Sequence, residues 1–138
     1  MTVYDFFCTV SHETNLLKAM KQEREWILQS LDYIRKSKSK DLANELAIIE
    51  EKASRQEREL VLCINRTMAL LSYANELIES LSRPEDKAVL IERYILGHTW
   101  KQVSENTYWS ISQLYIINRR AIEEIEDKHP EFSKRTEL

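Results

Sequence analysis

The sequence predicts an all-α protein: a long antiparallel helical hairpin, coiled-coil-like, followed by a C-terminal helix-turn-helix. Helix breakers are rare, since 138 residues contain one Gly and two Pro. Apolar residues alternate at spacings of three and four through the first half, as on one face of a helix. In the second half, Ser or Thr stands three residues before Glu or Gln at three places, the capping-box pattern of a helix start. We therefore expect a hairpin over 1–81, a helix-turn-helix over 82–126 and a frayed tail over 127–138.

The first half predicts two helices that fold back on each other. One covers about 14–35, and its apolar stripe consists of Leu17, Met20, Ile27, Leu31 and Ile34. The polar run 36–40 ends it, and Asp41 is a suitable N-cap for the next helix. The second stripe keeps the same repeat through Leu42, Leu46, Ile49, Ala53, Gln56, Leu60, Cys63, Thr67, Leu70, Ala74, Leu77 and Leu81. A seven-residue repeat of this length implies that the helix supercoils against a partner helix.

The lengths of these two helices predict self-association. At 1.5 Å per residue the first spans roughly 33 Å and the second roughly 60 Å, so part of the longer stripe is left uncovered. The remainder must meet the C-terminal helices, the apolar segment Met1–Val10 or another copy of the chain. A polar Gln56 in the stripe either fixes the register of an oligomer or is satisfied within the chain. We expect a homo-oligomer, with a dimer as the simplest form.

The second half predicts three short helices. They start at Ser82, Thr99 and Ser110, each with Glu or Gln three residues later. Gly97 lies where a residue in the left-handed conformation would end the first of them. The inner stripe of the third helix consists of Leu114, Ile117, Ala121 and Ile125. In a helix-turn-helix this third helix enters the DNA major groove.

The candidate DNA contacts lie mainly on the other faces of the third helix. Gln and Asn can pair with adenine, Arg with guanine, and an apolar side chain with the thymine methyl group. The candidates are Lys101, Ser112, Gln113, Tyr115, Ile116, Asn118, Arg119 and Arg120.

The same stretch resembles region 4 of sigma-70-type factors, most closely in small phage regulators of the RinA/ArpU kind. The matching runs are VLIERYI (89–95), TWKQVS (99–104), YWS (108–110), LY (114–115) and RAI (120–122). The resemblance implies a transcription regulator of a phage or mobile genetic element in a Gram-positive host, typically an activator of late genes. By the same analogy RNA polymerase is a second partner.

Two departures from that pattern favour a rival hypothesis. Tyr108 replaces the usual turn glycine, so the turn is expected to be longer or rearranged. Four acidic residues crowd positions 123–127, unfavourably for phosphate contact, and the net charge of the chain is −3. The rival is a protein–protein adaptor of a mobile element, for example one that binds a terminase small subunit and redirects DNA packaging. A purely structural coiled coil would not need three capping boxes.

Other features point to no catalytic site. The basic run Arg35, Lys36, Lys38 and Lys40 contacts phosphate or an acidic partner, or is a solvated hairpin tip. Trp100 and Trp109 fit core positions better than base-stacking platforms. The two Cys and three His have no metal-ligand spacing, and one glycine leaves no phosphate-binding loop. We expect no metal, no cofactor and no enzymatic activity, in a cytoplasmic protein without a signal peptide or membrane span.

Overall fold

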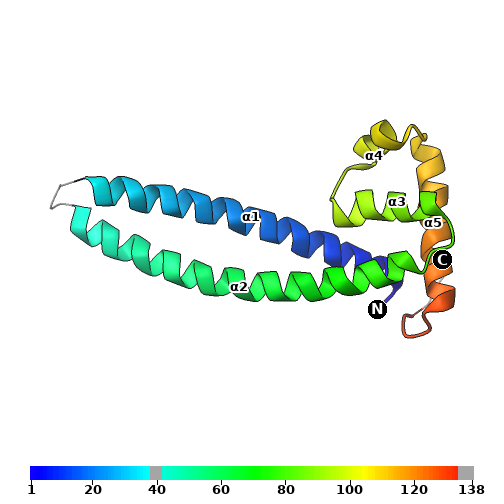
Figure 1. The fold of residues 1–138 in the computed structure, drawn as a ribbon, viewed down its shortest axis with the longest axis horizontal. Helices are drawn as coiled ribbons and strands as arrows, with labels where there is room; N and C mark the ends of the chain where they lie inside the picture. The colour runs from blue at the N-terminus through cyan, green and yellow to red at the C-terminus, as the bar shows by residue number, and fades with distance from the viewer. Residues whose placement is uncertain (38–41, 134–138) are drawn as a thin grey trace. The chain divides into compact units, whose positions relative to one another are not determined.

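The computed structural model describes residues 1–37 and 42–133, and it confirms the all-α fold with a long helical hairpin (Figure 1). In these residues no β-strand forms, and one isolated parallel bridge joins Thr2 to Ser133. No helix in the described part combines the length and the apolar character needed to cross a membrane. The elements are α1 (Val3–Lys36), α2 (Ala43–Glu79), α3 (Pro84–Leu90), the π-helical turn η2 (Ile91–Ile95), α4 (Trp100–Thr107) and α5 (Ile111–Lys128).

The expected start of the first helix, near Thr14, is wrong, because α1 begins at Val3. The first turns of α1 bury four apolar side chains, Val3, Phe6, Phe7 and Val10. Their spacing is that of one helical face, so burial of this face stabilises a helix over the apolar segment Met1–Val10 from Val3 onward. Asp41, the expected N-cap of the second helix, lies outside the described residues.

The chain divides into two compact units, and their boundaries differ from the expected boundary between residues 81 and 82. The first unit comprises Met1–Thr14 and the chain from Met68 onward; the second is Asn15–Thr67. Both ends of the hairpin therefore belong to the same unit as the helix-turn-helix.

The second unit is a helical pair, and its buried polar residues Gln56 and Thr67 each make a contact within the chain. Gln56 is 5% exposed, and its Nε2 donates to the backbone carbonyl of Met20 across the pair, 2.7 Å away. Thr67 is also buried, with its hydroxyl 3.9 Å from the Sγ of Cys63. The amide nitrogen of Gln56 is therefore bonded within the chain, whereas its buried oxygen has no hydrogen-bond partner among the described residues.

The two hairpin helices are nearly equal in length, contrary to the expectation from which self-association was inferred. Helix α1 has 34 residues and α2 has 37, which correspond to about 51 Å and about 56 Å. A helix of nearly equal length is available to cover the α2 stripe. Self-association stays a prediction, without this support.

The first unit has two apolar clusters. The smaller cluster contains Val89, Val103, Leu114 and Ile117, with Trp100 and Trp109 partly buried against it, which confirms their core positions. The larger is built from both ends of the hairpin, α3, η2 and α5. Its buried members are Val3, Phe6, Phe7, Val10, Ala74, Leu77, Ile78, Leu81, Leu90, Tyr94, Ala121, Ile122 and Ile125.

The expected inner stripe of the third helix is confirmed, since its four members are 0–3% exposed. The expected frayed tail from residue 127 is wrong in its first part. Helix α5 continues to Lys128, and the ring of Phe132 lies 5.7 Å from that of Phe6 and 5.9 Å from that of Tyr73. Aromatic packing orders this segment as far as Ser133, whose N–H donates to the carbonyl of Met1. Residues 134–138 lie outside the described chain.

Candidate nucleic-acid interface

Two of the three predicted capping boxes form, and they start the two helices of the helix-turn-helix. Thr99 Oγ1 accepts from the N–H of Gln102, while Gln102 Oε1 accepts from the N–H of Thr99. Ser110 and Gln113 make the same reciprocal pair at the start of α5, both at 3.2 Å. Each pair satisfies two backbone donors that a helix start leaves unbonded, so the starts of α4 and α5 are set locally.

The end of the preceding helix also follows the prediction at Gly97. This residue has φ 74°, and the N–H of His98 donates to the carbonyl of Glu92 at 3.0 Å. Before it, the N–H of Leu96 donates to the carbonyl of Ile91, five residues back, which is the π-helical turn. The glycine thus closes the helix and directs the chain into α4.

The turn between α4 and α5 corrects the expectation of a longer or rearranged connection. Tyr108 itself adopts the left-handed conformation, with φ 62° and ψ 14°, and its N–H donates to the carbonyl of Ser104. The hydroxyl of Ser104 donates to the carbonyl of Trp109, 2.5 Å away. These bonds hold the turn short, and the Tyr108 side chain is 94% exposed. The turn between α4 and α5 is therefore short, and Tyr108 adopts the left-handed conformation that is unfavourable for a residue with a side chain.

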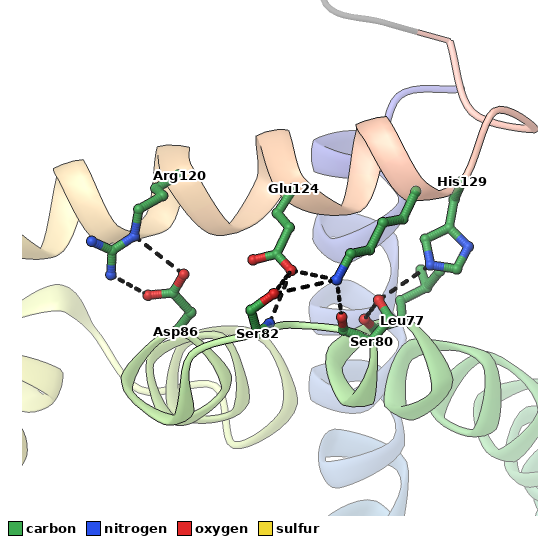
Figure 2. A network of polar contacts seen from close by, with 8 residues as sticks. Leu77, Ser80, Ser82, Asp86, Arg120, Glu124 and His129 are labelled. Carbon is green, nitrogen blue, oxygen red and sulfur yellow. Dashed lines mark hydrogen bonds and ion pairs between the residues drawn. The ribbon is translucent and has the colours of Figure 1, made fainter.

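The third predicted cap, at Ser82, is wrong. Arg83 is the N-cap of α3 and makes no side-chain cap bond, with Pro84 as the first helical residue. Both the N–H and the hydroxyl of Ser82 donate instead to Glu124 Oε2 on α5, at 2.9 and 2.8 Å (Figure 2). A tertiary acceptor thus replaces the local one.

A polar network surrounds this contact and joins the end of α2 to α5 (Figure 2). Lys128 Nζ lies 2.6 Å from Glu124 Oε2 and donates to the carbonyl of Ser80 at 2.5 Å. His129 Nε2 lies 3.2 Å from the hydroxyl of Ser80. The bond from Lys128, followed by those from Ser82, lowers the pKa of Glu124. This carboxylate is therefore held in its charged form.

A buried ion pair holds α3 against α5 (Figure 2). Asp86 is fully buried, and both its carboxylate oxygens accept from Arg120, from Nε at 3.2 Å and from one terminal nitrogen. Glu85 lies 3.7 Å from the same guanidinium. The bond to Asp86 raises the pKa of Arg120. Arg120 thus has a structural partner inside the unit.

Five of the exposed side chains of α5 lie along one face. Ile111, Tyr115 and Ile116 are 41%, 54% and 65% exposed, and Ser112 and Arg119 are exposed as well. Positions separated by three or four residues share a helical face, so these five side chains form one surface. We call it the α5 face. The ring of Tyr115 meets that of Trp100 edge-on at 5.4 Å, and the guanidinium of Arg93 lies over Trp100 at 4.8 Å.

The structure separates the predicted DNA contacts into two groups. Lys101, Ser112, Tyr115, Ile116 and Arg119 are exposed. The other three bond within the fold. Gln113 belongs to a capping box, Asn118 Oδ1 accepts from the hydroxyl of Tyr94 at 3.0 Å, and Arg120 binds Asp86. Burial raises the pKa of Tyr94 to about 12, so its hydroxyl remains a proton donor to Asn118.

The predicted basic hairpin tip is partly described, and its described members have acidic neighbours. Arg35 lies 3.2 Å from Glu50, and Lys36 lies 2.9 Å from Asp32. All four side chains are substantially exposed, so these are surface pairs of small energy. Lys38 and Lys40 lie outside the described residues.

Asp86, which orients α5 through Arg120, was not among the predicted site residues, although its position in the sequence indicated that it is buried. Asp86 precedes Val89 and Leu90 by three and four residues, which places it on the buried face of α3. A charged residue at such a position requires an ionic partner. The partner, Arg120, is 34 residues away, and no local spacing identifies it.

Among residues 1–37 and 42–133, no group of three or more His, Cys, Asp or Glu side chains is arranged to hold a metal ion. Comparison of the chain with protein families, with curated proteins and with solved structures finds no match. The α5 face and its surroundings are therefore the features from which a function can be inferred.

Proposed function

We propose that this protein is a sequence-specific DNA-binding transcription regulator of a phage or mobile genetic element, acting in the cytoplasm and without catalytic activity. The observation that carries the proposal is the α4–Tyr108–α5 arrangement. Two capping boxes and a short turn present the first half of α5 to solvent, while its opposite face is buried. This is the arrangement through which a recognition helix enters the major groove.

The charges near the α5 face support binding that is weak for a single copy. Lys101 and Arg119 are exposed, and no described residue forms an ion pair with either. Arg120 bonds to Asp86, and Glu123 is exposed one turn beyond Arg119. Two available cations neutralise about two phosphates, which corresponds to a slope of log K against log salt of about −2 per copy. Specific binding then requires two half-sites or a second contact, for which RNA polymerase is our proposal.

The test is binding of the whole chain to promoter fragments of its own genetic element, measured by fluorescence anisotropy between about 50 and about 300 mM salt. We expect binding at the low end that is lost at the high end. Lys101→Gln and Arg119→Gln should each reduce the slope by about one. Arg58→Gln is the matched control, because Arg58 is an exposed arginine of α2 and its loss makes the same change in net charge.

The adaptor hypothesis is favoured by a different observation. Gln113, Asn118 and Arg120, three of the side chains best suited to read bases, are bonded within the fold. The α5 face is mainly apolar. If no promoter fragment is retained at about 50 mM salt, while a purified terminase small subunit forms a stoichiometric complex, the helix-turn-helix is a protein-docking surface and DNA binding is refuted.

A further inference from the structure

The two amide side chains that could read adenine, Gln113 and Asn118, are each already bonded within the fold through the amide oxygen. Adenine recognition by Gln or Asn is bidentate and uses both the amide oxygen and the amide nitrogen. The oxygen of Gln113 accepts from the N–H of Ser110, and the oxygen of Asn118 accepts from the hydroxyl of Tyr94. Each bond ties the amide oxygen to the start of α5 or to Tyr94, and so restricts the orientations in which the amide could pair with adenine.

The exposed groups that remain on the first two turns are chiefly apolar. Ile116 is 65% exposed and Ile111 is 41% exposed. Tyr115, between them on the face, is held edge-on against Trp100. In the major groove the apolar group available for such side chains is the C5-methyl group of thymine, which cytosine lacks.

We propose that the α5 face recognises thymine through its C5-methyl group, with Ile116 as the main contact and Ile111 as the second. This inference rests on the proposed DNA binding and specifies its base preference. The cations of the surface are placed for such an occupant: Lys101 on α4 and Arg119, one turn beyond Tyr115 on α5, are available to phosphates beside the apolar strip. The hydroxyl of Ser112 can donate a hydrogen bond to a base or accept one from it, so it adds no preference for one base over another.

The expected size of the effect follows from the area of one methyl group. Burial of a CH₂-sized group changes an equilibrium constant by about fourfold. Removal of one contacted methyl should therefore weaken binding by about that factor. Two contacted methyl groups would weaken it by about 16-fold if their effects multiply.

The experiment uses the full chain and duplexes recovered by selection from a random-sequence library at about 50 mM salt. Each recovered duplex is made with thymine and again with deoxyuridine at single positions, which removes the methyl group and keeps the base pairing. We expect recovered sites to contain thymine at fixed positions, and deoxyuridine there to raise Kd about fourfold. Ile116→Ala should bind the two forms of the affected position equally.

Ile48→Ala is the matched control, because Ile48 of α2 is 67% exposed, close to the value for Ile116. It should keep the full difference between thymine and deoxyuridine. This comparison separates a contact from a structural effect, since a merely weakened fold would lower both affinities and leave their ratio unchanged.

The outcomes that overturn the inference differ from those that overturn the proposed function. A protein that binds selected duplexes with equal affinity for thymine and deoxyuridine at every position binds DNA, but not through the methyl group. A difference that persists in both Ile116→Ala and Ile111→Ala assigns the methyl contact to other residues and also refutes the inference. Failure to recover any duplex refutes DNA binding and the thymine preference together.

Discussion

Removal of Arg120 should destabilise the helix-turn-helix unit much more than an isosteric change of its partner Asp86. Arg120→Met leaves the Asp86 carboxylate fully buried without its main cation. Leaving a buried charge unpaired costs about 3–5 kcal/mol. In Asp86→Asn the amide oxygen still accepts from the guanidinium, whose side chain is 38% exposed and also lies 3.7 Å from Glu85. We expect a loss of about 1.5 kcal/mol, the value of one charge-assisted hydrogen bond.

Urea unfolding followed by tryptophan fluorescence measures this difference. A Trp26→Phe background leaves Trp100 and Trp109 as reporters, both of which pack on the smaller core cluster of this unit. The matched control is Arg119→Met, because the neighbouring Arg119 is exposed and its loss should change stability by less than about 0.5 kcal/mol.

Two results would refute the reasoning. Equal losses for Arg120→Met and Asp86→Asn would mean that the buried carboxylate is satisfied by something other than Arg120. A loss in Arg120→Met no larger than in Arg119→Met would mean that the ion pair does not hold α3 to α5. A further check is the double variant Asp86→Leu with Arg120→Met, which should be more stable than Arg120→Met alone because no buried charge is left.

The remaining predictions concern the turn, a cap, a carboxylate and the oligomeric state. Tyr108→Gly should raise stability by about 1 kcal/mol in the same urea assay, since glycine accepts the left-handed conformation without steric cost; an unchanged midpoint would contradict this. Ser110→Ala should lower it by about 1 kcal/mol through loss of a capping hydroxyl, and no loss would mean that this cap does not stabilise α5. The pKa of Glu124 is lowered from 4.5, so the stability that this carboxylate contributes is complete above about that pH and is lost as the pH falls through the lowered value. Glu124→Gln should flatten this dependence of unfolding free energy on pH, and an unchanged dependence would count against the network. Light scattering at micromolar concentration should give at least twice the 16.4 kDa of one chain, whereas a monomer mass would rule out self-association.

Much of the helix layout was predictable because its causes are local. The boxes at Thr99 and Ser110 join groups three residues apart, and Gly97 needs only its own backbone freedom to end a helix. The α2 stripe repeats every seven residues, and its members Gln56 and Thr67 are buried despite being polar. The same rule extended backward would also have found the start of α1, since Val3, Phe7 and Val10 continue the pattern of the later stripe.

The candidate site was predictable only in outline. Periodicity identified the buried stripe of α5 and so the face left exposed, including Tyr115, Ile116 and Arg119. It could not show which polar side chains on or beside that face were already bonded. Asn118 and Arg120 lie within one turn of Arg119, yet their partners, Tyr94 and Asp86, are 24 and 34 residues away.

The sequence by itself determined the all-α class, the hairpin, and the start of α4 and α5, because a helix start and an amphipathic face depend on residues within one or two turns. Only the tertiary structure determined the bonding partner of Ser82, which fits a capping box but bonds to Glu124, 42 residues away. It likewise decided that Arg120 holds the fold together instead of reaching outward. The physical reason is that a buried or clustered polar group bonds to whichever complementary group packing brings closest, and packing joins residues that no local spacing relates.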